Sequence, residues 1–264
     1  MGPVPVFDPG SRAHDSFRRA PEFRLHRCAR SVRGARVVWQ CGPWCDEGVV
    51  ETVLLSDPRV ATIPVSTDVD EAILSDGVGV PGLVIDPRKA DAAGCWSKIR
   101  PEIFEMLQTA AEHASRNGLT LRLVEGYRPG FLQARYFEEY LESLRAEDPN
   151  RSETELRSLA ARHVSPPEIA PHTAGAAVDV TLERDGVELD LGCPVNATPE
   201  CSNGLCFTDH PGVTGAAAEN RRALIDIMTT AGFVNYPTEW WHWSYGDRYW
   251  AWATASHEAL FGPI

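Results

Sequence analysis

Apolar residues recur along the chain with two different periods, which predict helices and strands. Residues 99–115 carry an apolar side chain every three or four positions and end just before Gly118, a pattern typical of an amphipathic helix. Residues 119–124 instead alternate apolar and polar side chains, which predicts a strand. The same reasoning predicts a strand over residues 176–182 and helices over residues 129–146, 152–164, 216–231 and 249–260.

Residues at the ends of these segments support the predicted boundaries. Pro129 suits the first turn of a helix, and Ser152 with Glu155 has the spacing of a capping box. Gly232 follows one predicted helix, and Asp247 precedes the last one as a cap. Helices and strands mix without regular alternation, so the sequence predicts an α+β fold rather than a doubly wound sheet.

The chain divides into two regions by composition. Residues 1–50 are rich in Arg, Pro and Gly and have no long periodic pattern, which predicts an irregular N-terminal extension. Residues 51–264 have the patterning of one globular domain, and this length is enough for a substantial core. Within that domain, residues 185–213 are rich in loop-forming residues.

Charge and hydropathy exclude two classes of partner. The formal net charge of −12 argues against nucleic acid, because affinity for phosphates depends mainly on Lys and Arg. No segment approaches the about 20 apolar residues of a membrane span. The first residues lack the basic start and apolar run of a secretory signal. We therefore expect a cytoplasmic protein, and leave a homo-oligomer open.

Seven cysteines make an odd count, which favours free thiols over a disulfide framework. Cys193, Cys201 and Cys206 lie close together, with His210 four residues after the last. Three states are open for this group: free thiols, a disulfide within the loop, or a structural Cys3His zinc site. The irregular spacing favours free thiols.

The segment from Thr238 to Ser244 contains the most informative polar residues. Glu239 and His242 stand three apart among three tryptophans. A carboxylate buried beside aromatic rings is costly unless it is compensated, and a divalent metal is one such compensation. His172 and Asp179 form a second polar set upstream. Together the two segments offer His, Asp and His as metal ligands and leave Glu239 as a base.

The spacing within each set requires a bend in the backbone. His172 and Asp179 are seven apart and would lie on opposite faces of a straight strand, so Gly175 is expected to provide a turn. Val178 and Val180 would then face the core, with Asp179 on an open face of the strand. Glu239 and His242 need a similar turn. Taken alone, each set also fits a structural role, as a turn histidine, an edge aspartate or a packed histidine.

Arg128 supplies positive charge where a predicted strand ends and a helix begins. Its neighbours, Glu125-Gly126-Tyr127 before it and Pro129 after it, are typical of such a junction. Arg128 is therefore a candidate to stabilise an oxyanion in a cleft, the alternative being a surface arginine at a turn.

Three motifs in this order resemble the zinc D-alanyl-D-alanine dipeptidases. They are Gly126-Tyr127-Arg128-Pro129, His172-(x6)-Asp179 and Glu239-Trp240-Trp241-His242. This family belongs to a wider group with zinc D,D-carboxypeptidases, cell-wall endopeptidases and hedgehog-like domains. The resemblance covers roughly residues 60–262. It implies that residues 51–264 form a catalytic domain, in which helices flank a small antiparallel sheet carrying the zinc site.

The resemblance also implies roles for individual residues. His172, Asp179 and His242 would hold one zinc ion per chain. Glu239 would act as general base and then acid, and Arg128 would stabilise the oxyanion. Tyr127 and Trp241 would contact the substrate, a small dipeptide or amide.

Two positions depart from the family pattern at the expected pocket for the substrate's amino group. Ala170 stands where the family has a serine, and Asn196 where it has an aspartate. Loss of that carboxylate disfavours a cationic amine, although Glu200 or Asp190 could replace it. We therefore expect a substrate other than simple D-Ala-D-Ala, such as an acylated amino-acid amide from a biosynthetic route. A non-hydrolytic zinc-bearing binding domain is a further alternative, and a cell-wall endopeptidase is less favoured.

Overall fold

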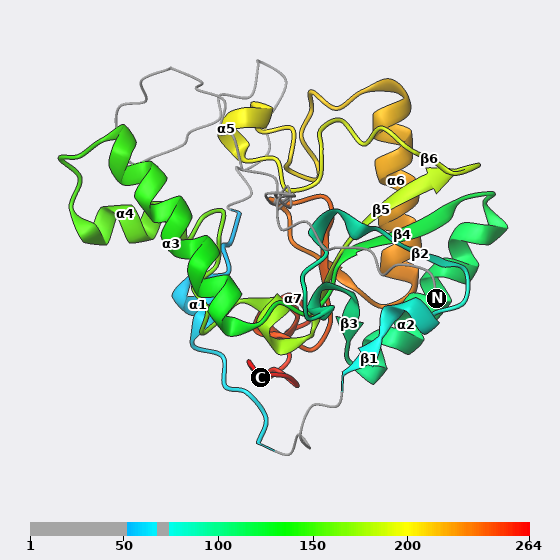
Figure 1. The fold of residues 1–264 in the computed structure, drawn as a ribbon, viewed down its shortest axis with the longest axis horizontal. Helices are drawn as coiled ribbons and strands as arrows, with labels where there is room; N and C mark the ends of the chain where they lie inside the picture. The colour runs from blue at the N-terminus through cyan, green and yellow to red at the C-terminus, as the bar shows by residue number, and fades with distance from the viewer. Residues whose placement is uncertain (1–51, 68–73) are drawn as a thin grey trace, which may run out of the picture. The chain divides into compact units, whose positions relative to one another are not determined.

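The computed structural model of the protein describes residues 52–67 and 74–264 (Figure 1). The predicted extension over residues 1–50 lies outside this range. Among the described residues, no helix combines the length and the apolar character needed to cross a bilayer.

A six-stranded mixed sheet forms the centre of the described domain. Its strand order is β2-β4-β5-β8-β7, and β6 pairs with the far end of β5. The strands are β2 (Leu83–Ile85), β4 (Thr120–Glu125), β5 (Ala177–Arg184), β6 (Val187–Glu188), β7 (Val234–Asn235) and β8 (His242–Ser244). A separate short pair consists of β1 (Ser75–Asp76) and β3 (Lys98–Ile99). The predicted α+β class is confirmed.

One edge of the sheet differs from the antiparallel arrangement that the resemblance implied. β2 and β4 run parallel, whereas all other pairs in this sheet are antiparallel. The helix α2 (Pro101–Arg116) lies between them in the chain. Parallel neighbours need such a crossover connection, and α2 supplies it.

Among the described residues, most of the helices form pairs. α2 and α6 (Gly215–Thr230) contact each other and cover one face, where α2 packs on β4 and α6 on β5. α3 (Gly130–Glu147) and α4 (Glu153–Ala160) pair with each other around their own small apolar cluster (Figure 1). The short helices α1 (Pro58–Ala61) and α7 (Arg248–Ala253) also pack together, and α5 (Pro199–Ser202) lies in the predicted loop region.

The predicted helices exist, but two end earlier than expected. α4 has the predicted capping box, with Ser152 and Glu155 bonded reciprocally, and ends at Ala160 rather than at 164. α7 has the predicted cap at Asp247 and ends at Ala253 rather than at 260. Ala255 has φ of 55°, a left-handed backbone conformation that cannot continue a right-handed helix. The chain then turns back, and Ala259 bonds to Pro64 and Ser66.

The central strand β5 is buried on both faces. Val178 and Val180 face the core as predicted, and both are fully buried. The opposite face, predicted to be open, is covered as well, since Thr181 and Asp179 are also buried. The Asp179 carboxylate on this strand must therefore find its partners inside the protein.

A matched pair of valine substitutions tests this packing. Val180→Ala in β5 removes two methyl groups from a fully buried site and should lower the free energy of unfolding by about 2 to 3 kcal/mol. Val187→Ala in β6 removes the same groups from a side chain that is 67% exposed. This substitution should change the free energy of unfolding by less than about 0.5 kcal/mol. Urea denaturation of both variants measures these changes in unfolding free energy. Equal effects would contradict the central position of β5.

Candidate functional site

The register of two neighbouring strands places Asp179 beside His242. β5 and β8 are antiparallel, and Asp179 lies directly opposite His242 in their ladder. Side chains at directly opposite positions project from the same face of a sheet, with their Cβ atoms only about 5 Å apart. Asp179 Oδ1 lies 3.2 Å from His242 Nδ1.

His172 reaches the same point from a short 3₁₀ turn, Pro171–Ala174, that leads into β5. The turn ends at Gly175, which has φ of 64°, a left-handed conformation that favours glycine. Gly175 thus provides the predicted bend. His172 Nδ1 lies 2.7 Å from the carbonyl oxygen of Gly126, so it carries the proton and donates it. The lone pair of the ring is then on Nε2, which points toward Asp179 and His242.

Gly126 must be glycine because the backbone passes very close to a neighbouring strand. A Cβ atom at this position would overlap the carbonyl oxygen of Lys98 and would lie 2.9 Å from Ile99 Cγ2. This close approach allows the Gly126 carbonyl to accept the Nδ1–H of His172 and so to fix the orientation of its ring. Such a contact fixes which nitrogen of a metal-binding histidine is free to coordinate.

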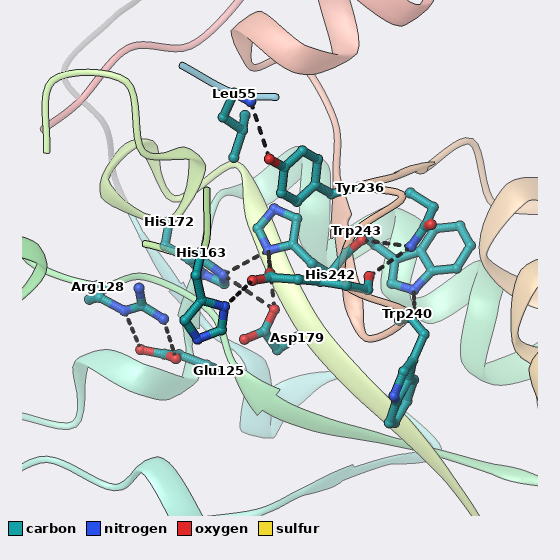
Figure 2. Close-up of polar contacts among 12 residues, drawn as sticks. Leu55, Glu125, Arg128, His163, His172, Asp179, Tyr236, Trp240, His242 and Trp243 are labelled. Atoms are coloured by element: carbon teal, nitrogen blue, oxygen red, sulfur yellow. Dashed lines mark hydrogen bonds and ion pairs between the residues drawn. The ribbon is translucent and has the colours of Figure 1, made fainter. Parts of the chain in front are cut away.

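Three ligand atoms converge on one point (Figure 2). His172 Nε2 lies 3.1 Å from His242 Nδ1 and 3.3 Å from Asp179 Oδ1. All three side chains are at most 6% exposed. Ligands bound tetrahedrally to one zinc ion at about 2.0 to 2.2 Å lie about 3.3 Å apart, so this triangle fits zinc. We call these three residues the ligand triangle.

The chemistry of the donor set also suits a cation. Burial opposes ionisation of Asp179, but both imidazoles outweigh it and hold the pKa of this carboxyl below its ordinary value. An anionic oxygen and two imidazole nitrogens then face one another at short distance. A divalent cation between them would stabilise all three at once.

Glu239 lies in the turn that precedes β8. Its N–H donates to Tyr236, and its carbonyl accepts from the N–H of His242. The Asn235 side chain donates to the carbonyls of both Glu239 and His242, and these two hydrogen bonds stabilise the turn. The required bend between Glu239 and His242 is therefore present.

The Glu239 carboxylate faces the ligand triangle with one oxygen and His163 with the other. Oε2 lies 3.9 Å from His242 Nδ1, and Oε1 lies 3.7 Å from His163 Nδ1. Burial raises the pKa of Glu239 to about 7; the charge of His242 opposes this shift and that of Asp179 adds to it. A carboxyl with such a pKa can both accept and donate a proton near neutral pH.

Arg128 is held in place by two buried side chains. Its Nε and Nη2 donate to the two oxygens of Glu125 at 2.7 and 2.6 Å (Figure 2). Its Nη1 donates to Gln133 at 2.7 Å. Burial and Glu125 act in opposite directions on the pKa of Arg128, and Glu125 raises it above its ordinary value. Three of the five N–H groups of the guanidinium are thereby used.

The four expected substrate-binding residues have different surroundings. Ala170 is buried just before the 3₁₀ turn, and Trp241 is buried against Trp240. The Tyr127 hydroxyl donates to the carbonyl of Ile264 at 3.2 Å, and Asn196 has a left-handed backbone with φ of 63°. Within the described residues, no side-chain hydrogen bond joins any of these four to the ligand triangle.

Sequence reasoning missed four residues that shape the site: Glu125, Gln133, His163 and Asn235. Glu125 was visible three positions before Arg128, a spacing that suits an ion pair. The others carry no local signal. Gln133 comes from α3, His163 from the segment that follows α4, and Asn235 from the end of β7.

The cysteine-rich loop contains free thiols. Cys193, Cys201 and Cys206 are all unpaired, and the ligand triangle is the only group of potential metal ligands among the described residues. Arg221 holds this loop together instead, since its guanidinium donates to the carbonyls of Leu191, Leu205, Phe207 and Thr208. Cys193 accepts from the Trp240 indole at 3.4 Å.

Comparison with known proteins identifies the family. The sequence model described as "D-ala-D-ala dipeptidase" matches residues 93–259, more than half of the chain. A D-alanyl-D-alanine dipeptidase of Enterococcus faecium is 32% identical over 154 residues, which cover 56% of this chain and 72% of that protein. One from Synechocystis is 37% identical over 90 residues, which cover 31% of this chain and 36% of that protein.

Two solved structures are similar to this chain at low sequence identity. VanYB in complex with D-alanine-D-alanine is 19% identical, with a TM-score of 0.44, and the match covers 75% of this chain and 88% of that one. The LdcB LD-carboxypeptidase is also 19% identical, with a TM-score of 0.43, and the match covers 73% of this chain and 76% of that one. On the extent of the sequence match, this chain belongs to the D-alanyl-D-alanine dipeptidase family of metallopeptidases.

Proposed function

We propose that this protein is a zinc-dependent hydrolase of a dipeptide or similar small amide. One zinc ion would be held by His172, Asp179 and His242. The observation that carries this proposal is the spacing of their three ligand atoms, 3.1 to 3.3 Å apart, with the Glu239 carboxylate beside them. When bound, zinc supplies Lewis acidity and lowers the pKa of water.

The protein's own residues would perform the proton transfers. Glu239 accepts a proton from the attacking water at Oε2, the oxygen that faces the ligand triangle. It then donates this proton to the leaving amine, which its raised pKa permits. Arg128 contributes fixed positive charge for the developing oxyanion, and its pairing with Glu125 holds the guanidinium in one orientation.

Substrate choice would differ from that of a typical family member. Ala170 offers no hydroxyl, and Asn196 offers a neutral amide in place of a carboxylate. Asp190 is already engaged, since its Oδ1 accepts from the N–H of Gly192 at 2.8 Å. A substrate whose amino group is acylated needs no anionic partner, so we propose that such compounds are preferred.

Substitution of Glu239 by the isosteric neutral residue tests the proposed base. Glu239→Gln should reduce kcat for dipeptide hydrolysis by at least about 100-fold, because the amide cannot accept the proton. Zinc content should stay at one ion per chain, measured by plasma emission spectrometry. His242→Ala should lose zinc as well as activity, and a chelator should abolish activity of the parent protein. Full activity of the Glu239→Gln variant would contradict the assignment.

A small panel of compounds tests the substrate class. The zinc-loaded protein should cleave N-acetyl-D-Ala-D-Ala at least about tenfold faster, in kcat/KM, than free D-Ala-D-Ala, because the free ammonium lacks a buried counter-charge. L-Ala-L-Ala and its N-acetyl form complete the panel. Equal or faster cleavage of the free dipeptide would show that the amine pocket is intact.

Two glutamate substitutions compare the buried and the exposed ion pair. Glu125→Gln leaves the buried Arg128 without a counter-charge and should cost about 3 to 5 kcal/mol of unfolding free energy. Glu188→Gln, at the exposed partner of Arg88, should cost about 1 kcal/mol or less. Glu125→Gln should also lower kcat, assayed well below its melting temperature. Similar stability losses in both variants would contradict the role of Glu125.

A further inference from the structure

His163 lies next to the proposed base but outside the ligand triangle. It follows α4 closely, with its N–H bonded to the carbonyl of Ala160. Its ring packs edge-on against Tyr140 of α3, with the ring centres 5.3 Å apart. Figure 2 places it between the Arg128–Glu125 pair and the ligand triangle. This imidazole brings the segment that follows α4 to the side of the proposed base.

The two oxygens of Glu239 have different neighbours, and this division suggests what His163 does. Oε2 faces His242, whereas Oε1 faces His163 Nδ1 at 3.7 Å. At 3.7 Å the contact is longer than a hydrogen bond, which requires about 3.2 Å or less. Catalytic contacts are often long without substrate and shorten when it binds.

The His163 ring is a suitable neutral donor. Burial lowers its pKa to about 4, so the ring carries one N–H and one lone pair at neutral pH. Lys89 and Arg128 act on this pKa in the same direction as burial, and Glu200 acts against it. A neutral ring can donate to a carboxylate without forming an ion pair that would hold Glu239 permanently charged.

We infer that His163 is a positioning residue for Glu239: its Nδ1–H donates to Oε1 and thereby keeps Oε2 directed at the ligand triangle. This inference rests on the proposed function, in which Glu239 is the base. A carboxylate held at one oxygen cannot rotate about its terminal bond, so its other oxygen keeps the orientation that proton transfer requires. The edge-on contact with Tyr140 restrains the plane of the imidazole.

Kinetics of two His163 variants separate positioning from simple packing. His163→Phe keeps an aromatic ring against Tyr140 but removes the donor, and should lower kcat by about 10- to 100-fold with KM changed less than about threefold. His163→Gln keeps an N–H and should retain at least about a third of parental kcat. His257→Gln, at an exposed histidine, is the control and should equal the parent. Equal kcat for the Phe and Gln variants would overturn the inference.

A spectroscopic measurement decides the inference even if no dipeptide is cleaved. Nitrogen-15 NMR of the zinc-loaded protein reports which ring nitrogen of His163 carries the proton, with His163→Gln used to assign the signal. Protonation at Nδ1 is expected, and protonation at Nε2 would overturn the inference. Absence of hydrolysis by the parent protein, together with Nδ1 protonation, would refute the proposed function and leave the orientation of Glu239 by His163 supported.

Discussion

The register between β5 and β8 is the constraint on which the site depends. It sets Asp179 opposite His242 and so fixes two corners of the ligand triangle at once. A slip of one residue would turn one of the two side chains to the other face of the sheet. Backbone bonds on both sides of the pair prevent this, including the one from Val180 to Trp241. The turn stabilised by Asn235 then delivers Glu239 to the same point.

Three carboxylates in this region, two of them buried and Glu239 mostly buried, have different ionisation behaviour because their partners differ. Burial alone would raise the pKa of each. Arg128 reverses the effect for Glu125, and the two imidazoles reverse it for Asp179. Glu239 has no arginine at hydrogen-bond distance, and burial prevails there, with a pKa of about 7. One neighbourhood thus provides two anions, Glu125 in a structural ion pair and Asp179 as a proposed metal ligand, and a third group able to exchange protons.

Sequence patterns predicted the long elements and the chemical residues, but not the contacts between them. α2, α3 and α6 follow from their apolar spacing, and β5 from its alternation. β8 has only three residues, too few for a period to be recognised, although it carries His242. The motifs identified the ligand triangle and Glu239. His163 could not be found, because its position depends on how α3 and α4 pair, which no local spacing specifies.

Two hydrogen bonds to backbone carbonyls join the Arg128 segment to His172. The Gly126 carbonyl accepts from His172 Nδ1, and the Arg128 N–H donates to the carbonyl of His172 at 3.1 Å. Each segment therefore fixes the other at two points, within a space that only glycine at position 126 permits. A shift of the 3₁₀ turn would move a ligand of the triangle and the guanidinium together. The distance between the proposed oxyanion donor and the ligand triangle is thus set by the backbone, while side chains such as Glu125 adjust only the orientation of the guanidinium.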